Sequence, residues 1–238
     1  MGRAFEFRKA RKMKRWSNMA KTFTRIGREI IIAVKDSGPD PSTNSKLRAI
    51  IQNAKAANMP KDNIDRAIKN ASEKNTEDFK EILLEGYAPY GIAILVEAAT
   101  NNNNRTVANI RSYFNKCDGS LATSGSVDFL FNHLCFFQIR DEGLDLEELE
   151  LDLIDFGVTD LSKSENEISI TAKFENFGSL QKELERRKFN ITSSEFEREA
   201  ITLKDLSEDE MIKVEKLVNM IDEDDDVQNV YHNLRSDN

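Results

Sequence analysis

The spacing of the apolar residues changes near residue 79 of this 238-residue chain, and the change limits the folds open to it. Before that point apolar side chains recur every three to four residues, which is the period of an α-helix. After it, short apolar runs separated by turn residues alternate with further helical segments. A chain of this length forms one large domain or two to three small ones. The sequence therefore indicates a helical segment followed by a mixed α and β segment.

Three short helices are predicted in the first 75 residues. The first spans about 20–35 and ends because Pro39 and Pro41 cannot continue it. The second spans about 44–58, and the third runs from about 60 to 71. Each helix has one apolar face, so the three are expected to pack together as a small bundle.

Strands and helices alternate after residue 79, with turn residues between them. Strands are predicted over 82–87, 92–98, 127–139, 158–161, 167–173, 194–203 and 227–234. A helix is predicted to follow the turn and N-cap residues 101–104 and to carry Val107, Ile110 and Phe114, and further helices are predicted over 145–156, 178–188 and 207–221. Short, mostly hairpin-linked strands favour antiparallel sheets over a doubly wound sheet. The predicted class is α+β: an N-terminal three-helix domain followed by two small α/β domains, each an antiparallel sheet plus helices.

Charge is distributed unevenly along the chain, although the net charge is only -8. Residues 1–74 contain 18 Lys and Arg against 7 Asp and Glu, whereas the remaining residues contain 16 against 35. Such asymmetry indicates a polyanionic partner at the basic end. The alternative is a basic arm that docks on the acidic part of its own chain.

Basic residues form a stripe on the first predicted helix. At about 100° per residue, four cations fall on one side of it, opposite the apolar face. These are Lys21, Arg25, Arg28 and Lys35. Six more cations precede the helix: Arg8, Lys9, Arg11, Lys12, Lys14 and Arg15. Arg48 and Lys55, seven residues apart on the second helix, extend the predicted nucleic-acid-binding surface. Phosphates would relieve the repulsion among these cations and release counterions.

Two aromatic residues, Phe5 and Trp16, lie among the basic residues. They could stack on unpaired bases, or they could pin the basic arm to the helical bundle. No zinc-finger spacing and no RNA-recognition aromatic motif is present. Sequence-specific reading of bases therefore has no support in the sequence.

Two loops after residue 79 are rich in asparagine and glycine, and each adjoins the helix that carries Val107, Ile110 and Phe114. They are 101–105 and 119–125. Such loops can approach a ligand closely, or they can simply supply turn conformations. On the first interpretation Arg105 is a second phosphate contact. The acidic run 222–226 lacks the spaced ligands and glycine of a calcium loop, so it is predicted to be a solvated turn.

No catalytic or metal-binding pattern is evident. The two histidines and two cysteines have no paired spacing, and no phosphate loop, dinucleotide fingerprint or nucleophile elbow is present. We therefore predict a non-enzymatic protein with no catalytic residues, no metal, no cofactor and no small-molecule substrate. No segment has the length and hydropathy of a membrane span or secretory signal. Free thiols at Cys117 and Cys135 suit a cytoplasmic protein.

Several stretches resemble the YebC/PmpR family. They are Lys21-Thr22-Phe23-Thr24-Arg25, Gly38-Pro39-Asp40-Pro41, the specific run Ala54–Ile68, Glu85-Gly86-Tyr87, Asn103–Val107 and Gly125-Ser126-Val127. The resemblance implies an N-terminal helical domain (1–77), a discontinuous middle domain (78–138 plus 200–238) and a domain inserted into it (139–199). It also implies a DNA-binding transcriptional regulator or, alternatively, a ribosome-associated translation factor that binds ribosomal RNA.

Overall fold

The computed structural model describes residues 19–73, 78–164 and 166–235, which fall into two compact units. Unit 1 contains the helices up to residue 73 together with His133–Glu197. Unit 2 contains the segment that ends at Asn132 together with the segment that begins at Arg198. The units therefore interleave along the chain. The three-domain division expected from the sequence stays a prediction, since unit 1 groups the N-terminal helices with a later segment.

The N-terminal helices of unit 1 are α2 (Met19–Ser37), α3 (Ser45–Ala56) and α4 (Lys61–Ser72). Their apolar faces form one core that includes Ile30 and Leu47, both fully buried. The side chain of Asn44 joins two helix ends. Its amide nitrogen donates to the carbonyl of Ala33 at 2.7 Å, and its oxygen accepts from the backbone N–H of Leu47 at 2.9 Å. The three predicted helices thus pack as the bundle expected from their periodicity.

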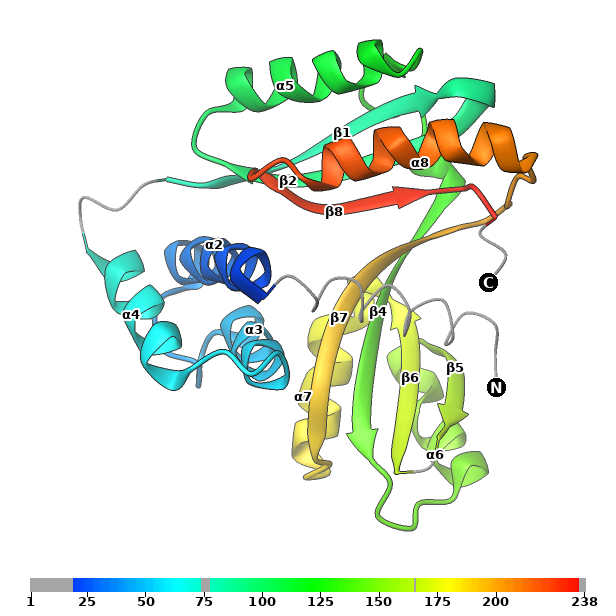
Figure 1. The fold of residues 1–238 in the computed structure, drawn as a ribbon. Helices are drawn as coiled ribbons and strands as arrows, with labels where there is room; N and C mark the ends of the chain where they lie inside the picture. Colours follow the sequence, from blue (N-terminus) through cyan, green and yellow to red (C-terminus); the bar gives the residue numbers. More distant parts are fainter. Residues whose placement is uncertain (1–18, 74–77, 165, 236–238) are drawn as a thin grey trace. The chain divides into compact units, whose positions relative to one another are not determined.

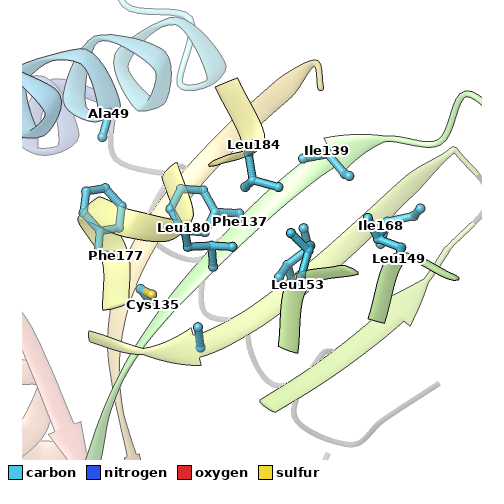
Figure 2. Packing of buried hydrophobic residues seen from close by; sticks show 12 residues of the cluster. Ala49, Cys135, Phe137, Ile139, Leu149, Leu153, Ile168, Phe177, Leu180 and Leu184 are labelled. Carbon is cyan, nitrogen blue, oxygen red and sulfur yellow. The ribbon is translucent and has the colours of Figure 1, made fainter. Parts of the chain in front are cut away.

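Unit 1 also holds a four-stranded antiparallel sheet in the order β5-β6-β4-β7. The strands are β4 (Phe131–Arg140), β5 (Val158–Lys163), β6 (Glu167–Lys173) and β7 (Ile191–Ala200). Helices α6 (Leu146–Leu153) and α7 (Phe177–Arg186) pack on this sheet. Leu153, Leu180 and Leu184 meet Phe137 and Ile139 in a fully buried cluster (Figure 2). Leucines four residues apart share one helix face, which is why both helices lie flat on the strands.

Helix α3 contacts the second part of unit 1 through polar and apolar groups. The side-chain amide of Asn53 donates to the carbonyl of Ser194 and accepts from its backbone N–H at 3.0 Å. β7 is an edge strand, so this pairing satisfies groups that the sheet leaves open. Ala49 belongs to the apolar cluster of the sheet.

Unit 2 is built on a second antiparallel sheet, in the order β3-β1-β2-β8. Its strands are β1 (Lys80–Ala88), β2 (Ile92–Thr100), β3 (Ser120–Leu121) and β8 (Val227–His232). Helices α5 (Asn103–Lys116) and α8 (Glu208–Asp222) lie side by side over the sheet (Figure 1). Ile94 and Val96 face them and are fully buried with Phe114 and Leu217. The α+β class predicted from the sequence is confirmed.

The element boundaries depart most clearly from the sequence prediction in two places. The strand expected over 194–203 is β7, which ends at Ala200, and the apolar Ile201 and Leu203 beyond it are exposed. The segment before β4 is a 3-10 turn over Asp128–Leu130 rather than strand. Apolar residues outside the sheet extended both predictions too far. Among the described residues, no helix is long and apolar enough to cross a membrane.

Candidate nucleic-acid interface

The predicted basic stripe lies on α2, but its four members differ in exposure. Lys35 is exposed, and Lys21 and Arg28 are half-buried. Arg25, by contrast, is only 4% exposed. The expectation of four solvent-facing cations is therefore wrong for Arg25. Helical periodicity assigned this residue to a face of α2 but carried no information on what packs against that face.

The six predicted phosphate contacts that precede α2 lie outside the described residues. They are Arg8, Lys9, Arg11, Lys12, Lys14 and Arg15. Phe5 and Trp16 lie outside them as well. These residues provide much of the basic excess of the N-terminal segment: 1–18 contains seven Lys and Arg against one Asp or Glu.

The two predicted cations of α3 have different surroundings. Lys55 is exposed near the end of the helix. Arg48 forms a two-pronged ion pair with Glu185 of α7, with Nε–Oε1 at 2.6 Å and Nη2–Oε2 at 3.1 Å. Its Nη1 also donates to the backbone carbonyls of Pro41 and Ser42. The guanidinium of Arg48 thus holds the loop before α3 and links α3 to α7.

Three exposed cations of α4 were not singled out from the sequence: Lys61, Arg66 and Lys69. Asp62 and Asp65 are exposed on the same helix. Charges of both signs are typical of a solvated helix surface, and a search for a one-sided row of cations does not detect such a helix. The cations of α4 therefore add to the basic surface of the bundle without forming a single-sign ridge.

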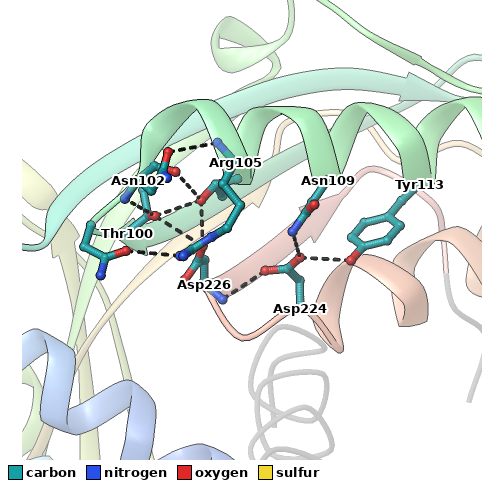
Figure 3. Close-up of polar contacts among 9 residues, drawn as sticks. Thr100, Asn102, Arg105, Asn109, Tyr113, Asp224 and Asp226 are labelled. Carbon is teal, nitrogen blue, oxygen red and sulfur yellow. Dashed lines mark hydrogen bonds and ion pairs between the residues drawn. The ribbon is translucent and has the colours of Figure 1, made fainter.

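Arg105 takes part in a hydrogen-bonded network in unit 2 (Figure 3). Its Nη2 lies 2.8 Å from Oδ2 of Asp226, a carboxylate whose side chain is 5% exposed. The hydroxyls of Thr106 and Thr100 donate to the same oxygen at 2.7 and 3.2 Å. The Arg105 side chain is 48% exposed. Its charge neutralises a buried carboxylate, and its role as a phosphate contact stays a prediction.

The acidic run 222–226 is not the solvated turn expected from the sequence. Asp224 is 8% exposed and Asp226 3% exposed. Oδ2 of Asp224 accepts from Asn109 at 3.2 Å and from the hydroxyl of Tyr113 at 3.0 Å. Burial and the nearby Asp224 raise the pKa of Tyr113. The polar residues of α5 recur at helical spacing, which is the sequence signal that could have revealed a buried polar partner.

The loop 119–125 and its continuation to Asp128 surround the carboxylate of Glu85 on β1. Glu85 is 3% exposed and accepts from the backbone N–H groups of Gly125 and Val127, both at 2.6 Å, and of Asp128 at 2.9 Å. Burial pushes the pKa of Glu85 upward, but these donors outweigh it and hold the pKa below its usual value. These backbone donors already bind a carboxylate of the protein itself, so the contact joins the stretches Glu85-Gly86-Tyr87 and Gly125-Ser126-Val127.

The histidines and cysteines are dispersed in the part of the chain that the structure describes. Among those residues, no group of three or more His, Cys, Asp or Glu side chains could hold a metal ion. His133 stacks on Phe174 with ring centroids 3.8 Å apart. Cys117 and Cys135 are buried free thiols, and burial raises the pKa of Cys135 to about 12.

Two family models match the chain. The one described as the TACO1/YebC protein N-terminal domain matches residues 3–74, and the one described as the TACO1/YebC second and third domain matches residues 79–234. A relative from Flavobacterium johnsoniae is 64% identical over 237 residues, covers 100% of both chains and is named "Probable transcriptional regulatory protein". A Parabacteroides distasonis relative with that name is 54% identical, over 100% of this chain and 98% of its own. A crystal structure of a conserved hypothetical protein from Aquifex aeolicus matches with a TM-score of 0.74 and 37% identity, covering 91% of this chain and 90% of that one.

Proposed function

The chain belongs to the TACO1/YebC family, and on that basis we propose that it is a nucleic-acid-binding regulator of gene expression that binds phosphate with its N-terminal segment, residues 1–77. Curated relatives are named probable transcriptional regulatory proteins, so duplex DNA is the proposed partner. A regulator is not an enzyme class. The two buried free thiols suit the reducing cytoplasm, where we place the protein.

The observation that carries the proposal is the segregation of charge. The basic excess of residues 1–74 is 11, while the rest of the chain has an acidic excess of 19. Within the described helices 19–73, ten Lys and Arg stand against six Asp and Glu. A local basic excess on an otherwise acidic protein attracts a polyanion to one region and repels it from the remainder.

The fold of the bundle is compatible with this role. The apolar residues of α2, α3 and α4 point into one core, which leaves Lys35, Lys55, Lys61, Arg66 and Lys69 exposed. Among the sequence-predicted contacts, Lys21, Arg28, Lys35 and Lys55 are the described side chains we assign to phosphate. Arg25 and Arg48 we assign to structure, because the first is buried and the second is held by Glu185.

The test is duplex binding by the full-length protein and a variant with three charge reversals, Lys21→Glu, Arg28→Glu and Lys35→Glu. A labelled DNA duplex titrated at low salt should bind the wild type and lose at least about a hundredfold in affinity with the variant, because each reversed cation removes one phosphate contact and adds a repulsion. The control carries Lys173→Glu, Lys182→Glu and Lys216→Glu, which are exposed and change the net charge equally. Equal losses in both variants would refute the proposal.

A phosphate-binding surface also suits ribosomal RNA, and one experiment separates the two partners. Lysate is sedimented through a gradient, with and without deoxyribonuclease or ribonuclease, and the protein is followed across the fractions. A DNA-binding regulator moves to lighter fractions after deoxyribonuclease. Comigration with ribosomes that only ribonuclease abolishes would replace the DNA proposal with a ribosome-associated role.

A further inference from the structure

Helix α5 is a basic element inside an acidic unit. Unit 2, taken as 77–132 with 198–238, contains 9 Lys and Arg against 19 Asp and Glu. Residues 100–117 nevertheless contain no Asp or Glu, and their cations are Arg105, Arg111 and Lys116. A solvated helix in an acidic domain would be expected to share the acidic composition. α8, the other α-helix described in this unit, does share the acidic composition.

The cations of α5 lie on the two flanks of its outer face. Thr106, Ile110 and Phe114 are fully buried and mark the inner face. At about 100° per residue, the middle of the outer face is formed by short side chains, Asn104, Ala108 and Asn115, all exposed. Arg111 then falls on one flank, and Arg105 and Lys116 fall on the other, roughly 120–140° away. Arg111 and Lys116 are both exposed.

The acidic turn after α8 does not face Arg111. Asp226 and Asp224 bind the edge of α5 that carries Arg105, Asn109 and Tyr113 (Figure 3). This edge runs from the flank that carries Arg105 and Lys116 toward the inner face, whereas Arg111 projects from the far flank. The turn therefore uses the Arg105 side of the helix, where the carboxylates of Asp224 and Asp226 are already hydrogen-bonded.

We propose that the outer face of α5 is a second phosphate-binding surface, which contacts the backbone of a nucleic-acid duplex through Arg111 and Lys116. A helix that lies in the major groove of DNA has a sugar-phosphate backbone on each side. Cations on both flanks of the helix match that arrangement. The short side chains between them permit close approach, and the amides of Asn104 and Asn115 can donate to phosphate or base edges. The B-form major groove admits a helix, whereas the major groove of A-form RNA is too narrow. This inference extends the proposed function to a site outside the N-terminal segment.

The test uses the full-length protein with Arg111→Glu and Lys116→Glu together, titrated with a labelled DNA duplex and with an RNA duplex of the same sequence. Arg105 is left intact because it pairs with Asp226. The control is Lys213→Glu with Lys216→Glu, which makes the same charge change on α8 of the same unit, among acidic residues. We expect the α5 variant to lose roughly tenfold or more in DNA affinity and the magnitude of its salt slope to fall by about 2, with a much smaller loss in the control.

The outcomes separate this inference from the proposed function. Loss with the α5 variant but full affinity of the Lys21, Arg28 and Lys35 reversal would support the second surface and refute the N-terminal one. The converse result would overturn the second surface alone, as would equal losses in the α5 variant and its α8 control. A loss seen only with RNA would overturn the groove geometry, and no binding of wild type to either duplex would overturn both. Thermal unfolding of the α5 variant should match the wild type, since exposed helix positions tolerate substitution.

Discussion

The guanidinium of Arg105 lies 2.8 Å from the carboxylate of Asp226, although 121 residues separate them in sequence. Arg105 lies in the first turn of α5, and Asp226 directly precedes β8. Their contact ties the turn between α8 and β8 to α5, the neighbouring helix over the same sheet. Thr100 and Thr106, both buried, share the same carboxylate oxygen. Asp226 is thus the centre of the network, and Arg105 is its solvent-facing member.

Asp226→Ala should therefore destabilise the protein more than Arg105→Ala. Removal of the carboxylate takes away the acceptor of the buried Thr100 hydroxyl and leaves the Thr106 hydroxyl only Thr100 Oγ1 and the Asn102 carbonyl, at a cost of about 2–4 kcal/mol. Removal of the half-exposed arginine should cost only about 1 kcal/mol, because solvent screens the ion pair and the two threonine hydroxyls still donate to the carboxylate. Urea unfolding of the two full-length variants, followed by far-UV circular dichroism, measures the difference. Equal costs would mean that Arg105 is the essential partner.

The same Arg105→Ala variant tests the sequence-based prediction of a phosphate contact. If Arg105 binds phosphate, the variant should lose about 1 kcal/mol of DNA-binding free energy. The comparison must be made at a temperature where both proteins are fully folded. Unchanged affinity for DNA and for ribosomes would limit Arg105 to its structural ion pair.

Glu85 should make stability depend on pH in the acid range. Its pKa is lowered in the folded state, so the carboxylate contributes stability that is present above its unfolded pKa of about 4.5 and is lost as pH falls through the folded value. Glu85→Gln replaces the acceptor with an amide that offers one oxygen, and should cost about 2 kcal/mol at pH 7. The difference from wild type should shrink below pH 4.5. Thermal melts across pH 3.5–7 check this, and a constant difference would contradict it.

Arg25 and Arg28 should respond differently to truncation, although both belong to the predicted stripe. Arg25 is 4% exposed, so Arg25→Ala removes packing as well as charge. We expect Arg25→Ala to lower the unfolding free energy by at least about 1 kcal/mol more than Arg28→Ala. When both variants are folded, Arg28→Ala should lose more DNA affinity than Arg25→Ala. A stable Arg25→Ala protein with weakened binding would restore Arg25 to the interface.

Binding through the N-terminal segment should depend strongly on salt. If about five of its cations neutralise phosphates, the logarithm of the association constant should fall against the logarithm of salt concentration with a slope near -4 to -5 on DNA. Each cation removed from α2 should reduce the magnitude by about 1. Anisotropy titrations between 50 and 200 mM salt provide the slope. A slope near zero would exclude an electrostatic interface.

The sequence by itself determined the local elements and the segregation of charge. Apolar spacing predicted α2, α3 and α4, because a helix that buries one face repeats its apolar residues at the helical period. Alternating strands and helices likewise predicted two antiparallel sheets with helices. Charge counts need no structure, so the basic N-terminal segment was visible directly.

Only the tertiary structure decided which polar residues are available to a partner. In the sequence, some charged residues cannot be told apart from exposed ones although the fold buries or ion-pairs them. They are Arg25, Arg48, Asp224 and Asp226. Their partners lie far along the chain, as Glu185 does from Arg48, and periodicity describes only neighbours within an element. The burial of a charge depends on whether a distant group compensates it, and that pairing arises only when the elements pack.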